Sequence, residues 1–442
     1  MMKRRDFVKQ SLGAAGVLGF GVPVKGKGLN ERIQHAAIGV SGMGRGDLAN
    51  IASHKKVQIV ALCDVDGDKL AKAAEKHPEA RLYRDWREML VKEGDQIDSV
   101  NVTTPDHMHA PISLAAMKRG KHVYCQKPLT RQISEARRMA EVAAKHGVIT
   151  QMGNQIHSHI AYRMGVAWIQ GGAIGKVKAV HSWVNAKFPQ QARPKVADPV
   201  PGSINWDHWL GVAPERPYNA GIYHPFKWRG WQDFGGGGIG DFGCHILDPV
   251  FTALELRPAK VTIEAEVDAK WRNDPARFKE SWPDWEIFQY TINGSERTAG
   301  DTLPITWYDG GKKPPAELAP LPEGQSLPAG GSLILGEKGA MLLPHVAGPR
   351  LLPAPDFEGY AKPDIPKNVN HYHSWVDGCL AGKQTSDNFA YAGPLSEVVL
   401  LGTLAARFPG ERLVYDAKKM AVTNHAAANV FVNQPWREGW EV

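Results

Sequence analysis

The chain has few cysteines, and they are far apart in the sequence. Four cysteines occur among its 442 residues, and no two of them form a Cys-x-x-Cys pair: Cys63, Cys125, Cys244 and Cys379. This spacing argues against a disulfide framework and against a zinc site built on thiolates. We therefore expect the cysteines to be small buried core residues.

The main part of the chain also lacks a strong charge bias. The formal net charge is +7, but residues 1–28 hold six basic residues and one acidic residue, so most of the excess lies there. A nearly neutral remainder gives no electrostatic footprint for nucleic acid, and we expect no such partner. With 43% hydrophobic and 22% charged residues, the composition is that of an ordinary globular protein. The length suits two or three domains of roughly 150 residues each.

The amino-terminal segment lacks the apolar length of a membrane span. A basic stretch that contains Arg4, Arg5 and then Phe7 precedes a short Gly- and Ala-rich run over residues 11–20. This order is typical of a secretory signal of the twin-arginine type, and the run is too short and too weakly apolar to span a bilayer stably. We predict export to the periplasm. Retention of the segment as an anchor stays open because no Ala-x-Ala cleavage site is evident, and a disordered basic tail is the alternative.

The sequence does contain a strand–turn–helix–strand pattern with glycines at the turn. An apolar run over residues 36–40 enters a turn at residues 42–46, a helix follows, and a second strand over residues 57–63 ends at an acidic residue. Glycines let the backbone approach a pyrophosphate, the helix N-terminus favours its charge, and a strand-end carboxylate suits two ribose hydroxyls. We predict NAD binding by Gly39, Gly42, Met43, Gly44, Arg45 and Asp64. NADP is less favoured because Asp64 would repel a 2′-phosphate. The glycine motif departs from the usual pattern at one position, since Asp47 occupies the place of the third glycine.

Polar residues at the ends of three later strands extend this predicted site. The carboxyl ends of parallel strands meet at the ligand-binding edge of such a sheet. The residues assigned to the cofactor there are Thr103, Thr104, Pro105, His107, His109, Gln126, Lys127 and Gln155. His107 and His109 could also bind a metal, but no third ligand has suitable spacing, and we predict no metal site.

A second cluster follows a glycine run at residues 235–240. If a helix begins near Gly240, Asp241 and His245 lie at i and i+4 on one face, and Pro249 would end or kink that helix. A carboxylate beside an imidazole fixes its tautomer and tunes its pKa for proton transfer. We predict that His245 is the general base for oxidation of a secondary alcohol and that Asp241 is its partner or a hydrogen-bond partner of the substrate. Lys127 would hold the reacting oxygen.

Tryptophans gather before the glycine run. Aromatic faces beside polar groups suit sugar rings, and we assign Trp228, Arg229 and Trp231 to substrate binding together with Asp241 and His245. Trp206 and Trp209 fit a core or subunit interface better.

These motifs in this order resemble the Gfo/Idh/MocA oxidoreductases, the family of glucose–fructose oxidoreductase and inositol dehydrogenase. The resemblance is carried by the glycine-rich turn, Asp64, residues 104–109, Gln126-Lys127-Pro128 and the pair Asp241 and His245. The runs at residues 388–397 and 436–440 are similar to the exported branch of the family. The resemblance implies a carbohydrate substrate and a homo-oligomer, either a dimer or a tetramer.

One position departs from the family pattern, which usually has Glu-Lys-Pro where this chain has Gln126-Lys127-Pro128. The missing carboxylate would have raised the pKa of the lysine. The departure therefore leaves open how Lys127 handles protons.

The predicted fold has two domains after a signal peptide and linker over residues 1–30. Residues 31–156 are predicted to form an α/β Rossmann domain with a parallel sheet. Residues 157–442 are predicted to form an α+β substrate and oligomerisation domain with an open, mainly antiparallel sheet, whose C-terminal helices pack back on the first domain.

Three functions compete on these motifs. The first is NAD(P)-dependent oxidation or reduction of a sugar, polyol or glycoside. The second is a redox-neutral cycle in which NAD oxidises a sugar transiently while a glycosidic bond is cleaved. The third is sugar binding without catalysis, which the presence of Lys127, Asp241 and His245 argues against.

Overall fold

The structure is a computed structural model that describes residues 31–367 and 369–442. The predicted export signal therefore lies outside the described residues. Within the described ranges, no helix is both long enough and apolar enough to cross a membrane.

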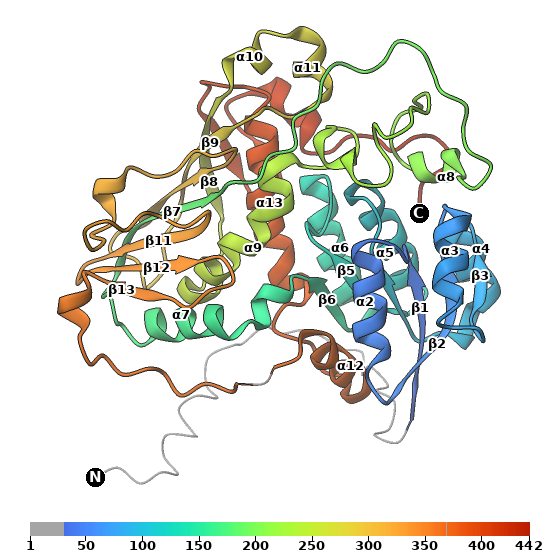
Figure 1. Ribbon diagram of the computed structural model, residues 1–442, viewed down its shortest axis with the longest axis horizontal. Helices are drawn as coiled ribbons and strands as arrows, with labels where there is room; N and C mark the ends of the chain where they lie inside the picture. Colours follow the sequence, from blue (N-terminus) through green and yellow to red (C-terminus); the bar gives the residue numbers. More distant parts are fainter. Residues whose placement is uncertain (1–30, 368) are drawn as a thin grey trace.

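Residues 33–153 form a parallel sheet of six strands in the order β3-β2-β1-β4-β5-β6 (Figure 1). The strands are β1 (Ile33–Ile38), β2 (Val57–Cys63), β3 (Arg81–Tyr83), β4 (Ser99–Val102), β5 (His122–Gln126) and β6 (Thr150–Gly153). The helices are α2 (Met43–Ala52), α3 (Gly67–Ala74), α4 (Trp86–Glu93), α5 (His109–Lys118) and α6 (Ile133–His146). The strand order reverses between β1 and β4, the point where such sheets bind ligands.

Residues 177–422 contain a mixed, mostly antiparallel sheet of nine strands in the order β13-β12-β11-β7-β10-β9-β8-β14-β15. Its strands are β7 (Val177–Val184), β8 (Lys260–Val267), β9 (Glu286–Asn293), β10 (Thr302–Tyr308), β11 (Gly330–Gly336), β12 (Ala340–Pro344), β13 (Arg350–Leu352), β14 (Leu413–Asp416) and β15 (Ala421–Val422). Along β8, buried Val261, Ile263 and Ala265 alternate with more exposed residues, as expected of a sheet with one packed face. The predicted fold class is confirmed, although the four short strands β12 to β15 were not anticipated.

Helices connect the two sheets. The helices that follow β6 are α7 (Ile160–Gln170), α8 (Trp206–Leu210), α9 (Gly237–Leu254), α10 (Ala269–Arg272), α11 (Pro275–Glu280), α12 (His371–Ala381) and α13 (Phe389–Ala405). Helices α9 and α13 lie between the sheets (Figure 1), and α13 packs on α6 as well as on α9 and β8. Arg137 on α6 donates from Nε and Nη2 to the two carboxylate oxygens of the buried Glu397 on α13, both at 2.7 Å.

Helix α9 differs from its predicted extent at both ends. It begins at Gly237 rather than near Gly240, and it continues through Pro249 to Leu254. Pro249 removes only the hydrogen bond to the carbonyl of His245, four residues earlier. Pro249 was expected to end or to kink the helix, and the helix does not end there. Packing on both sides of the helix holds it together past the proline.

Two glycines allow the turn between β1 and α2 to pack closely. A Cβ on Gly39, whose φ is +80°, would lie 2.2 Å from the carbonyl oxygen of Thr103. A Cβ on Gly44 would lie 2.1 Å from the carbonyl oxygen of Gly39. Any side chain at these positions would force the turn away from the end of β4.

Asp47 on α2 organises the polar core beneath this turn. Its carboxylate accepts hydrogen bonds from Thr103 Oγ1 and Gln126 Nε2, both at 2.8 Å, and from Tyr372 Oη on α12 at 2.9 Å. Burial raises the pKa of Asp47, although these donors oppose the rise. A glutamate at position 126 would face this carboxylate, so Gln126 is the residue that Asp47 requires.

We expect Gln126→Glu to destabilise the protein by about 1–3 kcal/mol at pH 7, because it replaces a buried amide donor with a second carboxylate. The new carboxyl would have a folded-state pKa above its unfolded value of about 4.3. The loss of stability is therefore fully present near neutral pH and shrinks as the pH falls toward that value. Urea unfolding at pH 7 and pH 5 measures both effects.

The control is the double variant Asp47→Asn with Gln126→Glu, which restores one carboxylate and one amide at this contact. It should recover most of the loss. Equal losses from Gln126→Glu in the wild-type and Asp47→Asn backgrounds would contradict the proposed coupling.

Candidate active site

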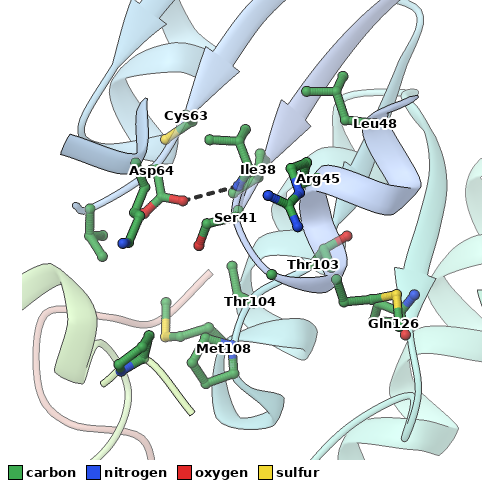
Figure 2. A pocket seen from close by; sticks show the side chains of 18 of the residues that line it. Ile38, Ser41, Arg45, Leu48, Cys63, Asp64, Thr103, Thr104, Met108 and Gln126 are labelled. Atoms are coloured by element: carbon green, nitrogen blue, oxygen red, sulfur yellow. Dashed lines mark hydrogen bonds between the residues drawn. The ribbon is translucent and has the colours of Figure 1, made fainter. Parts of the chain in front are cut away.

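A cavity of about 650 Å³ lies at the carboxyl ends of the parallel strands (Figure 2). Most of the predicted site residues line it: Gly39, Gly42, Met43, Arg45, Asp64, Thr103, Thr104, Pro105, His109, Gln126, Lys127, Trp228 and Arg229. The parallel sheet thus brings together residues from four strand ends. Two further residues, Trp228 and Arg229, come from the second half of the chain. That combination gives the cavity one wall from each sheet domain.

Asp64, at the end of β2, has its two oxygens fixed by the backbone. Oδ2 accepts from the backbone N–H of Val40 at 3.0 Å, the dashed line in Figure 2. Oδ1 accepts from the backbone N–H of Asp66, also at 3.0 Å. Burial raises the pKa of Asp64, and these two donors oppose the rise. Each carboxylate oxygen can accept a second hydrogen bond, so the group is held in place and still able to bind hydroxyls.

Lys127 follows β5 and points toward α9. Its Nζ donates to the backbone carbonyl of Asp241 at 2.6 Å and to Asp241 Oδ1 at 2.9 Å. Arg229 Nε donates to the same Oδ1 at 3.1 Å. Burial alone would raise the pKa of Asp241, but the two cations outweigh it and hold the pKa well below its usual range. Asp241 therefore remains ionised and fixes both cations at the cavity.

His245 has a different partner from the one the sequence predicted. Asp241 was predicted to be either the partner of His245 or a hydrogen-bond partner of the substrate. The partner of His245 is instead Asn154, whose Oδ1 lies 2.5 Å from His245 Nδ1. Asp241 is instead bound to Lys127 and Arg229. The i, i+4 spacing correctly placed both residues on one helix. The carboxylate of Asp241, however, accepts a hydrogen bond from Lys127 of the other domain rather than from His245.

The orientation of Asn154 fixes the tautomer of His245. Asn154 Nδ2 donates to the carbonyl of Cys244 at 3.2 Å, so Oδ1 is the face turned to the imidazole. His245 Nδ1 then carries the proton, and Nε2 keeps a free electron pair. Burial, and then the charge of Lys127, lower the pKa of His245 well below its usual range. The ring is therefore neutral near pH 7, and Nε2 is its basic atom.

Six predicted residues do not line the cavity. Asp241 and His245 lie on α9, where Asp241 bonds to the lining residues Lys127 and Arg229, and Gly44 packs beneath Gly39. Gln155 donates to Tyr372 Oη at 3.0 Å, which turns it toward α12. His107 and Trp231 have surroundings that differ from those predicted for them.

His107 and Trp231 are buried in an aromatic cluster. His107 is fully buried, with Nε2 bonded to the carbonyl of Trp209 at 3.0 Å and its ring packed on Trp209 and Phe234. The ring of Trp231 is 1% exposed and donates from Nε1 to the carbonyl of Ile222 at 2.9 Å. Their assignments to cofactor and substrate are therefore corrected to core packing. The predicted core role of Trp209 is confirmed by its burial at 3% exposure, and this residue also lines the cavity.

Three residues at or near the site were missed by the sequence analysis. Asn154 directly follows β6, where a polar strand-end residue could have been noticed. Asp106 lies inside the Thr104–His109 motif and lines the cavity, and burial raises its pKa to about 8. His345, whose ring centroid is 5.9 Å from that of His245, had no sequence signal at all.

Two models of the Gfo/Idh/MocA family match the chain. The model described as oxidoreductase family, NAD-binding Rossmann fold, matches residues 33–154, and the model described as oxidoreductase family, C-terminal alpha/beta domain, matches residues 172–291.

Curated relatives match part of the chain. The levoglucosan dehydrogenase of Pseudarthrobacter phenanthrenivorans is 23% identical over 42% of this chain and 40% of its own length. The inositol 2-dehydrogenase of Rubrobacter xylanophilus is 29% identical over 36% of this chain and 45% of its own length. The matched part thus spans less than half of each of these two relatives.

Solved structures share the fold over most of both chains. The WlbA dehydrogenase of Bordetella pertussis, in complex with NADH and UDP-GlcNAcA, aligns with a TM-score of 0.58 at 19% identity over 86% of this chain and 98% of its own. The aldose-aldose oxidoreductase of Caulobacter crescentus gives a TM-score of 0.58 at 16% identity over 86% and 99%. This likeness shows a shared fold, and the two family models, which together match more than half of the residues, establish that the chain belongs to the Gfo/Idh/MocA oxidoreductase family.

Proposed function

We propose that this protein transfers hydride between a nicotinamide cofactor and a secondary alcohol of a sugar, polyol or glycoside. The arrangement of Lys127 and His245 carries the proposal. Lys127 at the wall of the cavity is fixed by Asp241, and His245 lies one helical turn after Asp241 on α9. The charge of Lys127 also contributes to the lowered pKa of His245. The chain therefore combines a cation for an alkoxide-like oxygen with a neutral imidazole that can accept a proton.

The cavity suits NAD in three respects. There is no space for a side chain at Gly39, so only backbone lines that part of the wall, and a pyrophosphate can approach it closely. The N-terminus of α2 opens on the cavity with no side-chain cap and no acidic residue in its first turn, which leaves its N–H groups and its dipole for a pyrophosphate. The carboxylate of Asp64 stands at the strand end where ribose hydroxyls are bound in such folds.

Bound NAD would supply the hydride acceptor, and the protein supplies the proton chemistry. His245 Nε2 accepts the hydroxyl proton of the substrate as the carbonyl forms. Lys127 Nζ, held by Asp241, donates a hydrogen bond to the same oxygen and stabilises its negative charge. Asn154 keeps the proton on Nδ1, so that Nε2 is ready to accept another.

A carbohydrate substrate is supported by the composition of the cavity. Trp209, Phe226 and Trp228 provide apolar faces, while His224, Arg229 and Lys127 provide polar groups beside them. Sugar rings present the same mixture of C–H faces and hydroxyls. The curated relatives named above act by name on levoglucosan and on inositol, which agrees with this substrate class.

NAD is favoured over NADP, although the same wall also carries cations. Asp64 would repel a 2′-phosphate at the ribose. Lys69 and Lys72 on α3 line the cavity as well and could attract one. We assign NAD because the carboxylate of Asp64 is fixed by two backbone bonds, whereas lysine side chains are free to turn to solvent.

A redox-neutral cycle is the second candidate, and Asp106 favours it. Cleavage of a glycosidic bond next to a transient keto group needs a further proton donor or acceptor beyond the one used for the alcohol. Asp106 lines the cavity among Arg229, Asp241 and Lys127, and burial raises its pKa to about 8, so it can carry a proton at neutral pH.

Export and assembly complete the proposal. Arg4, Arg5 and Phe7 support transport of the folded protein by the twin-arginine route to the periplasm, with cofactor loaded beforehand. The open sheet supports a homo-oligomer, either a dimer or a tetramer.

We expect the purified protein to bind NAD and to act on sugars or glycosides supplied one at a time. A lasting rise in absorbance at the reduced-nicotinamide band indicates net oxidation, and substrate consumption without such a rise indicates the redox-neutral cycle. Lys127→Met should lower the rate by about 10²–10³-fold, with a much smaller effect on NAD affinity. The exposed Lys92→Met on α4 is the matched control. Absence of any NAD affinity would leave only the binding-protein function.

The rate should depend on pH through His245. Because the pKa of His245 is lowered well below 6.5, kcat/KM should stay high at pH 6.5 and fall only at lower pH, as Nε2 becomes protonated. Asn154→Asp places a carboxylate at Nδ1, which favours the imidazolium and moves the acid limb to higher pH. His245→Asn should lower kcat by about 10²–10⁴-fold and abolish this limb. An acid limb that stays in place in Asn154→Asp would exclude His245 as the base.

Cofactor choice should depend on Asp64. We expect the apoprotein to bind NAD at least about tenfold more tightly than NADP, and Asp64→Ser to narrow that ratio by weakening NAD and relieving repulsion of the 2′-phosphate. Titration of tryptophan fluorescence with each nucleotide measures both affinities. The exposed Asp95→Ser, outside the cavity, serves as the control, and tighter binding of NADP by the wild type would reverse the assignment.

A further inference from the structure

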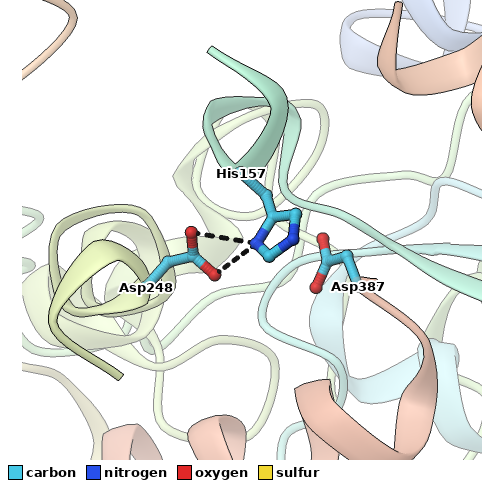
Figure 3. A group of neighbouring side chains, drawn as sticks. All are labelled: His157, Asp248 and Asp387. Carbon is cyan, nitrogen blue, oxygen red and sulfur yellow. Dashed lines mark hydrogen bonds and ion pairs between the residues drawn. The ribbon is translucent and has the colours of Figure 1, made fainter. Parts of the chain in front are cut away.

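A second group of functional side chains lies one helical turn beyond His245. It consists of His157 in the 3₁₀ turn Gln155–Ser158, Asp248 on α9, and Asp387 just before α13 (Figure 3). One ligand atom from each of the three lies within 4.8 Å of those of the other two. The carboxylates are 2% and 1% exposed for Asp248 and Asp387. These residues take no part in the hydride chemistry proposed above.

The carboxylate of Asp387 is buried without a partner. Neither of its oxygens has a hydrogen bond to any residue within the described ranges. Figure 3 shows its side chain turned toward His157. A buried carboxylate left without hydrogen bonds costs far more free energy than one that is paired. The site therefore needs either a proton or a cation at Asp387.

The other two members are already preorganised. His157 Nδ1 lies 2.9 and 3.1 Å from the two oxygens of Asp248, and His157 Nε2 lies 2.9 Å from Ser386 Oγ. Tyr391 donates to Asp248 Oδ1 at 2.8 Å. These contacts fix the imidazole between the two carboxylates, and an imidazolium there balances one of the two negative charges.

We propose that His157, Asp248 and Asp387 bind a first-row divalent cation such as Zn²⁺ or Mn²⁺. One imidazole and two carboxylates suit this class of ion, and the two carboxylates balance its charge. Ligand atoms bound at roughly 2.0–2.2 Å in a tetrahedral site lie about 3.3–3.6 Å apart. The ligand atoms here lie within 4.8 Å of one another, so a rotation of the Asp387 side chain would bring the set to this spacing.

The site is accessible and its position gives it a structural role. A neighbouring cavity of about 380 Å³ is lined by His157, Ser386 and Asp387 and provides a route for the ion. The ion would join three segments that all support His245. His157 follows Asn154, Asp248 follows His245 on α9, and Asp387 accepts a backbone bond from Met152 in β6. The proposal departs from the metal-free expectation of the sequence and does not depend on the proposed function.

The test uses the full chain without an affinity tag, stripped with a chelator and dialysed against Zn²⁺. We expect about one zinc per chain by elemental analysis, together with release of protons near pH 7, because the bound imidazole and Asp387 give up theirs. Asp387→Asn and His157→Gln should each weaken binding by more than the roughly 10–100-fold that loss of an outer partner costs. Asp377→Asn, on the exposed rim of the same cavity, should bind zinc as the wild type does.

Three results would overturn the proposal. The first is a wild type that takes up no zinc and releases no protons. The second is Asp387→Asn that binds as much zinc as the wild type. The third is Asp387→Asn that raises the melting temperature equally with and without zinc, because Asp387 is then a protonated acid and no metal site exists. Should the variants fail to fold, zinc stoichiometry and proton release in the wild type decide the question alone.

Discussion

The contact between Lys127 and Asp241 is the interaction on which the rest of the site depends. The lysine follows the parallel sheet, and the aspartate lies on a helix of the second half of the chain, 2.9 Å away. Both side chains are nearly buried, at 10% and 15% exposure. Loss of one partner from such a pair leaves an uncompensated charge and typically costs about 3–5 kcal/mol. The pair therefore sets the distance between the Rossmann sheet and α9, and with it the place of His245 relative to the cofactor cavity.

The same electrostatic constraint explains why the chain departs from its family at Gln126. A carboxylate is still present near this strand end, but it comes from Asp47 on α2, at the position where a third glycine is usual. Gln126 donates to it at 2.8 Å. A second carboxylate at this point would face the first in a buried environment. Asp47 and Gln126, which are far apart in the sequence, are therefore two halves of one buried contact. Tyr372 from the C-terminal region donates a further hydrogen bond to Asp47.

The sequence predicted those features that depend on local pattern. The strands of the first sheet, the glycine turn and the strand-end residues follow from hydrophobic runs that a single stretch of chain contains. It failed where partners come from distant segments. The i, i+4 spacing of Asp241 and His245 suggested that they bond to each other, yet Lys127 and Asn154, from the other domain, take these roles. Trp231 has the aromatic surface of a sugar-binding residue, and only its three-dimensional surroundings show that it is 1% exposed. The short strands β12 to β15 have too few residues for alternation to be visible.

Helix α9 shows how one element can organise so much of the site. Asp241, His245 and Asp248 follow one another at i, i+4 and i+7, which places them on one face of an otherwise apolar helix. Each polar group on this face is bonded to a different segment: Asp241 to Lys127, His245 to Asn154, and Asp248 to His157. A buried helix can carry such a stripe only if every polar group has a partner. The need to satisfy these three side chains thus forces the end of β5 and the turn after β6 against α9. The catalytic geometry follows from that requirement, because the residues that satisfy the stripe are the same ones that position the lysine and fix the histidine tautomer.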